Sequence, residues 1–311
     1  MTRSFLGPKK MTRTFPGTKK WKRSLHRIAL AYAFSLPAIL LFAVFKFYPI
    51  ILAFVMSLQR FVPLGARPFV GLANYGAVMH DDLFWISLQN TSIYVVFVVG
   101  AGTMLSLALA YLVNQRIRGI KAFRTIYFLP VVTSLVVISI VWKYLYYPSP
   151  RGLFNQVLGL VGIPAQTWLS DPKLALGAII VMAIWARVGY DMVIYLAALQ
   201  GLEKEILEAA SIDGATWWQR FWHIEFPSIR FAVFIVTILG VMRAYRVFTP
   251  ILVMTNGDPN HGTEVLATYI YRAGFMNYQM DYAAAMSFIL FLVILILTVF
   301  QLDVERRVER G

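Results

Sequence analysis

Long apolar runs separated by short polar segments dominate this 311-residue sequence. A transmembrane α-helix needs about 20 consecutive, mainly apolar residues, and six runs are long enough. They lie at about 28–58, 89–113, 125–146, 174–199, 229–254 and 282–302. Within a bilayer the backbone N–H and C=O groups must pair inside the segment, which helices achieve. The sequence therefore predicts an all-α integral membrane protein with about six transmembrane helices, whose membrane domain spans residues 28–302.

The composition agrees with this fold class and narrows the function. Hydrophobic residues make up 59% of the chain and charged residues only 14%, against about 25% charged in soluble domains. No polar segment much exceeds about 30 residues, which is too short for an independent domain. Cysteine is absent, which excludes disulfides and Cys-based metal sites. We therefore expect no soluble catalytic domain in this chain.

The distribution of Lys and Arg predicts the orientation. Nine of the 29 lie in the N-terminal tail, residues 1–27, and three lie in the C-terminal tail, residues 303–311. With both tails inside, the inner segments hold nine, four, three and three basic residues, 19 in all, and the outer loops hold five. This follows the positive-inside rule and predicts cytoplasmic termini. The charge is placed for membrane lipid rather than for nucleic acid, which a folded basic surface would bind.

One inner segment, residues 201–230, is unusually specific. Strong helix formers fill residues 203–212, and Asp213-Gly214 follows as a helix stop. Thr216 and Gln219 have the spacing of a capping box that begins a second short helix. Trp217, Trp218, Phe221 and Trp222 suit a membrane–cytosol boundary. The pattern predicts a helix–turn–helix unit whose first helix is offered to a partner.

The same segment carries a family motif. Glu208-Ala209-Ala210 is followed after three residues by Gly214, after nine more by Ile224, and then by Phe226-Pro227. This spacing resembles the EAA loop of permease subunits of bacterial binding-protein-dependent ABC importers, with Phe226 where leucine is usual. Further stretches resemble the sugar-importer branch (maltose, oligosaccharide and glycerol-phosphate permeases): Tyr127–Pro130, Trp142-Lys143, Trp185, Gly189-Tyr190, Ala197–Gln200, Met254–Gly257 and Tyr269–Tyr271.

The resemblance implies a type I importer permease in a bacterial cytoplasmic membrane, importing a sugar or related polyol. Its implied partners are a second homologous permease, two ATPase subunits and an extracytoplasmic solute-binding protein. No GxxxxGK[ST] phosphate loop occurs in the sequence, so ATP and Mg would be used by the partner ATPase and no cofactor is expected here. The residues implied to dock the ATPase through a coupling helix are Glu208, Ala209, Ala210, Ser211, Asp213, Gly214, Ala215, Ile224 and Pro227.

Four charges fall inside the apolar runs, where ionisable side chains usually face a cavity or another helix. Arg187 and Asp191 are spaced i,i+4 and can pair, while Arg243 and Arg246 share a helix face. One hypothesis is that they line the substrate pathway and favour an anionic cargo, such as a uronate oligosaccharide or a phosphorylated polyol, since Arg binds carboxylate or phosphate through two hydrogen bonds. The other is that the arginines are structural, pairing with Asp191 or with the second permease.

Two other function classes remain as alternatives. A secondary transporter or channel driven by an ion gradient would often show internal repeats and ion ligands within spans. No convincing repeat of that size is visible in the sequence, and the segment 201–230 would be unexplained. A membrane-embedded enzyme would need a cluster of acid, base or metal ligands. The four histidines are widely separated and lie in tails or loops: His26, His80, His223 and His261.

Overall fold

The computed structural model describes the whole chain except residues 1–29, 31, 63–64, 66, 115–119 and 311. The predicted basic tail and half of the basic turn after the second apolar run lie outside the described residues. Where the structure describes the chain, it is helical, with one isolated antiparallel bridge between Gln59 and Phe69. The chain divides into two compact units, residues 1–55 and 56–311.

The first unit contributes a single apolar helix that extends from Tyr32 to Ser57. Within it a π-helical turn, η1 (Ala43–Phe47), is followed by α2 (Tyr48–Ser57). The π turn lies just before Pro49, which lacks the N–H that a regular helix needs. Large apolar side chains such as Phe34 and Phe45 are 82% and 75% exposed, as expected of a lipid-facing helix.

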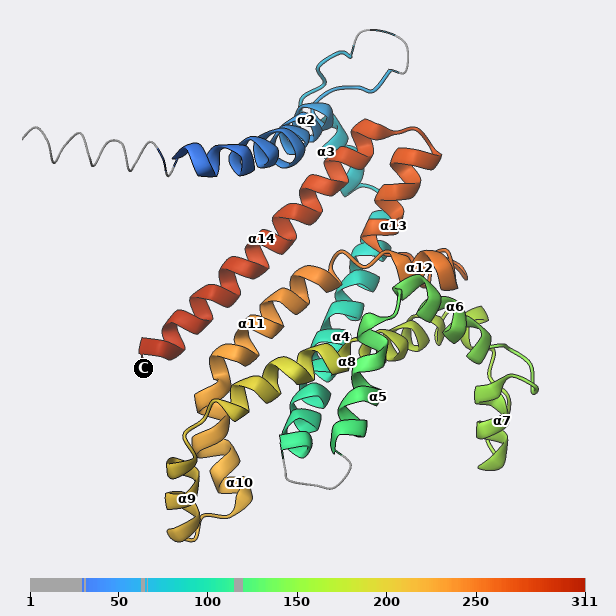
Figure 1. Ribbon diagram of the computed structural model, residues 1–311. Helices are drawn as coiled ribbons and strands as arrows, with labels where there is room; N and C mark the ends of the chain where they lie inside the picture. The colour runs from blue at the N-terminus through green and yellow to red at the C-terminus, as the bar shows by residue number, and fades with distance from the viewer. Residues whose placement is uncertain (1–29, 31, 63–64, 66, 115–119, 311) are drawn as a thin grey trace, which may run out of the picture. The chain divides into compact units, whose positions relative to one another are not determined.

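The second unit is built around two long helices, α4 (Asp82–Asn114) and α8 (Ala175–Gln200), which lie against each other (Figure 1). Small residues on α4, including Ser106 and Ala110, are buried where the two helices pack together. The Ser106 hydroxyl donates a hydrogen bond to the Val188 carbonyl of α8 at 3.1 Å. Small residues of α4 thus lie at a helix–helix contact.

The other described helices of this unit lie around this pair, and all of them except α14 are shorter than either. They are α3 (Ala73–Met79), α5 (Ile120–Val132), α6 (Leu135–Leu145), α7 (Leu153–Leu160), η2 (Trp168–Ser170), α9 (Lys204–Ile212), α10 (Trp217–Arg220), η3 (Phe221–Glu225), α11 (Phe226–Ala244), α12 (Thr249–Met254), α13 (Leu266–Tyr271), η4 (Arg272–Met276) and α14 (Met280–Arg310). Among the described helices, five are long and apolar enough to cross a membrane, or six if the bent pair α5–α6 forms one span.

Two of the expected spans are not continuous helices. The span expected over 125–146 consists of α5 and α6, which meet at 111°. Pro130 removes one backbone donor from the last turn of α5, and Ser134 then adopts an extended conformation (ψ 130°). The span expected over 229–254 ends at Ala244, and α12 starts only at Thr249. Hydropathy is similar on both sides of each break, so composition alone does not reveal them.

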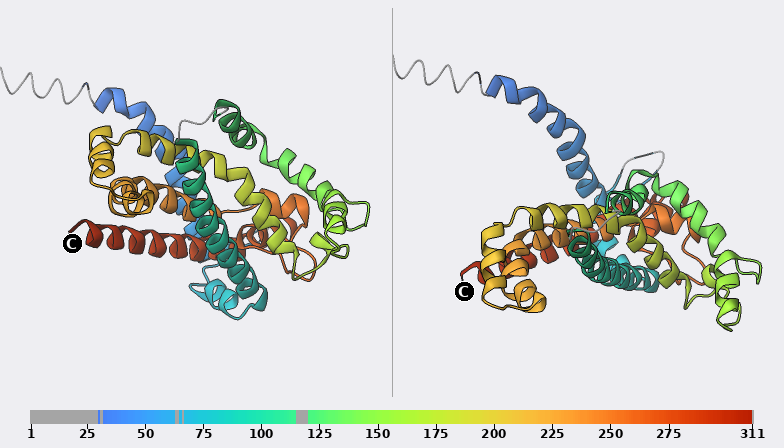
Figure 2. Two further views of the ribbon diagram at one scale, coloured as in Figure 1. Left: turned by 90° about the horizontal axis from the view of Figure 1, so that it is seen from below. Right: turned by 60° about the horizontal axis from the view of Figure 1, so that its bottom comes forward.

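The arrangement of the second unit separates two regions. α9 and α10 lie together at one end of α8 and α11, whereas α6 and α7 lie at the other end in each view (Figures 1 and 2). α11 runs from the α10 end towards α12 (Figure 1). A single helix therefore connects the EAA segment with the region where both broken spans change direction.

Candidate functional sites

α9 forms the first half of the predicted helix–turn–helix unit and buries none of its residues. Glu208 and Ala209 are exposed and Ala210 is half-buried. Two large apolar side chains also face outward, Ile206 at 50% and Ile212 at 86% exposed. An exposed helix with small and apolar side chains has the character of a surface that a partner covers.

The turn after α9 depends on Gly214, whose φ of +78° lies in the left-handed region. Glycine adopts this conformation without the steric cost that a Cβ brings. The turn is closed by hydrogen bonds from the Asp213 N–H to the Ala209 carbonyl and from the Ala215 N–H to the Ala210 carbonyl, both at 3.0 Å. The helix stop expected at Asp213-Gly214 is therefore present.

The second half begins with the predicted capping box. The Thr216 hydroxyl accepts from the Gln219 N–H, and the Gln219 side-chain oxygen accepts from the Thr216 N–H at 2.8 Å. The rings of Trp217 and Phe221 pack on Tyr111 of α4, with centroid distances of 5.9 and 5.3 Å. Of the remaining motif positions, Ile224 is half-buried in η3 and Pro227 is exposed in the first turn of α11.

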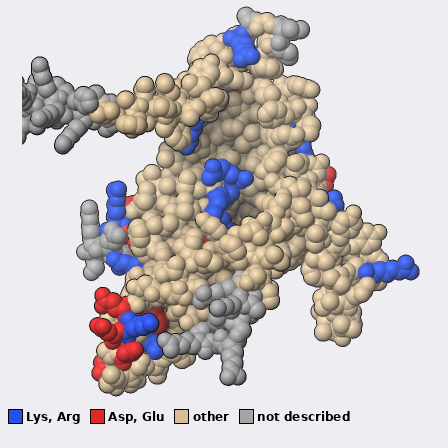
Figure 3. All heavy atoms as spheres, viewed as in Figure 1, with Lys and Arg blue, Asp and Glu red and all other residues tan. Residues whose placement is uncertain are grey.

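Four of the nine residues implied to dock the ATPase, namely Asp213, Gly214, Ala215 and Ile224, line one hollow of about 410 Å³, together with Gln219, Arg220 and His223. Acidic side chains gather beside it, at the α9 end of the molecule (Figure 3). Glu203, Glu205, Glu208 and Asp213 are all exposed there. This surface is complementary to a partner that presents basic groups.

An ion pair that the motif does not predict lies at the base of this unit. The Arg220 Nε donates to the Glu225 Oε1 at 3.1 Å, and the Glu225 side chain is only 6% exposed. The Arg220 Nη1 also donates to the Ser211 hydroxyl at 3.3 Å. The sequence does not predict these contacts. Arg220 and Glu225 are five residues apart, which is not the i,i+3 or i,i+4 spacing of neighbours on an α-helix. Ser211 and Arg220 lie on opposite sides of a turn.

A second site is a cavity of about 410 Å³ where α4, α5, α6, α8, α11 and α12 meet. Arg187, Arg243 and Arg246 all line it, as do Tyr94, Val98, Pro130, Thr133, Ile138, Tyr190, Phe248 and Pro250, among others. Figure 3 shows the corresponding basic side chains in a central hollow. The structure thus brings three arginines together at one cavity, from α8, from α11 and from the turn that follows α11. Their spacing in the sequence relates only Arg243 and Arg246 to each other.

The acidic member of the predicted set is buried against these arginines. Asp191 is 4% exposed, and its Oδ2 accepts from the Arg187 Nε at 2.8 Å. The Arg243 Nη2 is 4.0 Å from the Asp191 Oδ1, and its guanidinium lies 5.2 Å from the Tyr190 ring centre. Among the described residues no carboxylate pairs with Arg246, whose Nε donates to the Met242 carbonyl. Three arginines and one aspartate leave a surplus of two positive charges.

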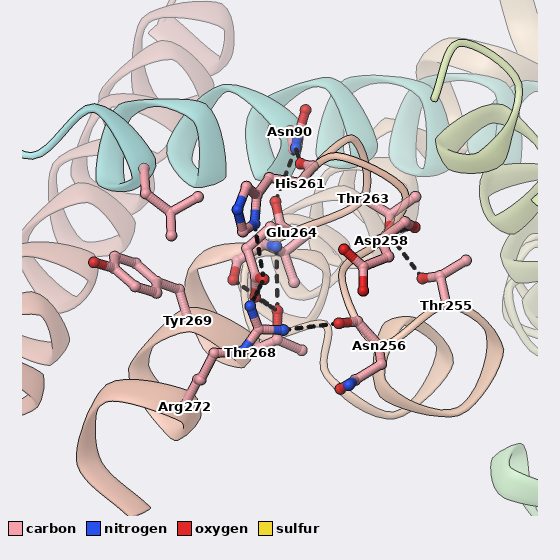
Figure 4. Close-up of polar contacts among 12 residues, drawn as sticks. Asn90, Thr255, Asn256, Asp258, His261, Thr263, Glu264, Thr268, Tyr269 and Arg272 are labelled. Carbon is pink, nitrogen blue, oxygen red and sulfur yellow. Dashed lines mark hydrogen bonds and ion pairs between the residues drawn. The ribbon is translucent and has the colours of Figure 1, made fainter. Parts of the chain in front are cut away.

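A third polar cluster holds the loop between α12 and α13 (Figure 4). Glu264 is fully buried and pairs with the Arg272 Nη1 at 2.7 Å, while its other oxygen accepts from the Thr268 hydroxyl at 2.7 Å. Asn90 of α4 donates to two carbonyls of the same loop, at 3.0 and 2.9 Å. A buried charge is stable only when it is paired and hydrogen-bonded in this way. The cluster therefore fixes the loop to α4.

Among the described residues no group of three or more His, Asp or Glu side chains is placed to hold a metal ion. The two regions with functional character are therefore the exposed EAA segment and the arginine-lined cavity.

Comparisons with known proteins agree on one family of transport proteins. Residues 19–310 match the model of the binding-protein-dependent transport system inner membrane component. The chain is 36% identical to the lactose transport system permease LacF of Rhizobium radiobacter, over 88% of this chain and 93% of that protein. It is 32% identical to the arabinooligosaccharide permease AraP of Halalkalibacterium halodurans, over 90% of this chain and 89% of that protein.

A solved structure extends the agreement to the fold. A chain of a bacterial ABC transporter that imports the acidic polysaccharide alginate is similar with a TM-score of 0.82 and 26% sequence identity. The match covers 93% of this chain and 99% of that one. On the strength of the matched motif, the helical architecture and these likenesses, the chain belongs to the family of inner membrane components of binding-protein-dependent transport systems.

Proposed function

We propose that this chain is the membrane-spanning permease of an ATP-driven importer for a sugar or oligosaccharide. The relatives named above carry lactose, arabinooligosaccharides and alginate. The observation that best supports the role is the EAA segment, whose motif residues form an exposed helix and turn beside a hollow. The segment is a docking surface, and the chain itself contributes no chemistry.

The proposed assembly contains this chain, a second homologous permease, two ATPase subunits and a solute-binding protein, all within or against membrane lipid. The ATPases bind ATP and Mg, and closure of the ATPase pair moves the docked helices. Rigid-body movement of this kind rocks the spans between inward- and outward-facing states. The orientation follows from the excess of basic residues in the inner segments, with both termini in the cytoplasm.

The docking role predicts a charge-dependent contact at Glu208, which is exposed on an acidic helix. Glu208→Lys in the full complex should lower the apparent affinity for the ATPase about tenfold or more, equivalent to about 1.4 kcal/mol. The measurement is co-purification of the ATPase with the tagged permease over a salt series. Asp303→Asn, which removes an exposed carboxylate outside the EAA segment, is the control. Equal ATPase recovery from Glu208→Lys and the control would argue against docking at α9.

The cavity supports a more specific proposal for the cargo, which is an acidic oligosaccharide. Its surplus of two positive charges matches the carboxylates of an acidic oligosaccharide, as in the alginate importer that resembles this chain. Arg243 and Arg246 use their Nε atoms on carbonyls of α11, at 3.2 and 2.9 Å. The terminal nitrogens of Arg246 are then placed to bind a ligand, while a ligand at Arg243 would share its Nη2 with Asp191, 4.0 Å away. Tyr190, beside Arg243, adds a ring against which a sugar can pack.

This assignment is tested with a matched pair of cargoes, an oligouronate and the same oligosaccharide after reduction of its carboxyl groups. Arg243→Gln and Arg246→Gln should each raise the KM for import of the oligouronate about tenfold, because a charge-assisted pair is lost. Import of the reduced oligosaccharide should change little. Arg151→Gln, at an exposed arginine that does not line the cavity, is the control. Equal effects on both cargoes would assign the arginines a structural role.

A further inference from the structure

We propose that Arg220 is a positioning residue that locks the docking helix α9 to the start of α11, so that movement of a docked ATPase reaches the arginine-lined cavity. This inference rests on the proposed function, because it concerns how the docked helix transmits movement. Neither the EAA motif nor the comparisons assign Arg220 a role.

Arg220 bridges the two sides of the turn. Its Nε donates to Glu225, the last residue before α11, at 3.1 Å. Its Nη1 donates to the hydroxyl of Ser211 in the last turn of α9 at 3.3 Å. Ser211 in turn donates to the Leu207 carbonyl one turn earlier, at 2.8 Å. One guanidinium thus connects the helix before the turn with the helix after it.

Burial makes the Arg220–Glu225 contact obligatory. The Glu225 side chain is 6% exposed, and its Oε2 has no hydrogen-bond partner among the described residues. An unpaired buried carboxylate is strongly unfavourable, and removing one partner of such a pair costs more than the pair itself contributes. Arg220, at 29% exposure, is the only cation within 4.0 Å of Glu225 in the described part of the chain. Glu225 therefore constrains where Arg220, and with it Ser211, can lie.

Packing alone does not provide this constraint. A cavity of about 600 Å³ is lined by Tyr111 and Leu112 of α4 on one side and by Leu207, Trp217, Arg220 and Glu225 on the other. α9 buries no residue of its own. Side chains that border open space cannot hold a helix at a fixed angle. The hydrogen bonds of Arg220 therefore join α9 to the residue before α11 across the turn and help to set the angle between the two helices.

α11 carries the constraint to the cavity. It is helical from Phe226 to Ala244, about 28 Å at 1.5 Å per residue, and its last turn bears Arg243, which lines the cavity. Figure 1 shows α11 extending from the α10 end to the neighbourhood of α12. If α9 and α11 move as one body, displacement of the docked helix shifts Arg243. If the joint is loose, the docked helix moves alone.

Because the chain has no cysteine, spin labels can be attached at introduced cysteines alone, which permits a direct test. Spin labels are placed at Lys204→Cys, the first residue of α9, and Phe231→Cys on α11, both exposed. The distance distribution is measured by pulsed electron paramagnetic resonance in the assembled complex, with and without ATP. We expect a single narrow distribution in both states for the parent and a distribution at least twice as wide for Arg220→Met. The charge swap Arg220→Glu with Glu225→Arg should restore the narrow distribution.

A matched pair of serines separates the bridge from general helix effects. Ser211 and Ser228 each donate to the carbonyl four residues earlier, at 2.8 and 2.6 Å, but only Ser211 contacts Arg220. Ser211→Ala should widen the distribution, and Ser228→Ala should not. The functional readout is the number of cargo molecules imported per ATP hydrolysed, which should fall at least fivefold in Arg220→Met and recover in the charge swap.

The outcomes distinguish this inference from the proposed function. If the parent chain does not assemble with an ATPase, the proposed function fails. If the complex assembles and Arg220→Met has both a narrow distribution and normal coupling, the positioning role of Arg220 is wrong. If Arg220→Met does not assemble, the role of Arg220 is judged from the charge swap Arg220→Glu with Glu225→Arg. Recovery of assembly with a narrow distribution supports the role, and continued failure overturns it.

Discussion

Gly189 in α8 marks the point of closest backbone approach between two helices. A Cβ at this position would lie 1.9 Å from the Tyr127 carbonyl oxygen of α5, far inside any allowed contact. Because the obstacle is backbone, Gly189→Ala must push α5 away from α8. We expect a loss of about 2–4 kcal/mol, the usual range for severe core overpacking and its repacking, seen as a lower midpoint of thermal unfolding in detergent.

Gly177 in the same helix is the control for that prediction. A Cβ there meets nothing within 4 Å, so Gly177→Ala should be neutral or stabilise by up to about 1 kcal/mol through helix propensity. If both alanine variants melt alike, the close approach at Gly189 has no energetic consequence.

Residue-level features were predictable only where their causes are local. The positive φ of Gly214 and the capping box at Thr216 each depend on a few consecutive residues, and the sequence predicts both. The need for glycine at position 189 depends on Tyr127, a residue of another helix. For the same reason the i,i+4 pairing of Arg187 with Asp191 could be predicted, whereas the contribution of Arg243 to the same cluster could not.

At the scale of elements, the start of α4 is tied to two later helices by one carboxylate. The hydroxyls of Tyr269 in α13 and Tyr282 in α14 both donate to the Asp81 Oδ2. Burial acts to raise the pKa of Asp81, but these hydrogen bonds, with those from the Leu83 and Phe84 N–H groups, outweigh it and lower that pKa below its ordinary value. The Asp81 charge therefore stabilises the fold at neutral pH.

Asp81→Asn should cost about 1–2 kcal/mol at pH 7, because charge-assisted hydrogen bonds are roughly twice as strong as neutral ones. The folded-state pKa is depressed, so this contribution is present above the unfolded value of about 3.9 and is lost as the pH falls through the folded value. The midpoint of thermal unfolding should be higher for the parent than for the variant at neutral pH, and this difference should narrow towards about pH 3. Asp82→Asn, at an exposed neighbour, is the control. A difference that does not change with pH would contradict the charge argument.

The existence of most elements could be predicted, but their interruptions could not. Pro130 signals a local weakness, yet a proline in an apolar run is compatible with a kink as well as with the 111° turn between α5 and α6. The direction that the chain takes after Ser134 depends on its packing against α8 and α12, which no window of the sequence contains. The same holds for the turn between Ala244 and Thr249.

For the whole molecule, the distribution of basic residues predicts which end faces the cytoplasm. Ile212 in the EAA segment and Leu160 at the end of α7 are each 86% exposed, and the chain has no cysteine. In cells with a permeable outer membrane, a membrane-impermeant maleimide should modify Leu160→Cys and spare Ile212→Cys. In inverted membrane vesicles the pattern should reverse. Labelling of Ile212→Cys from outside would overturn the topology and, with it, the ATPase contact.

Two of the three arginines of the cavity, Arg243 and Arg246, lie at the end of α11 and in the turn that follows, whereas Arg187 belongs to α8. Arg243 is 42% exposed at its side chain and Arg246 is exposed. Substitution at such positions changes folding free energy by only about 0.5 kcal/mol. If Arg243 and Arg246 select the cargo as proposed, a lineage can exchange a neutral cargo for an acidic one by a few substitutions without rebuilding its helix packing. Cargo preference and folding stability would then depend on largely separate residues.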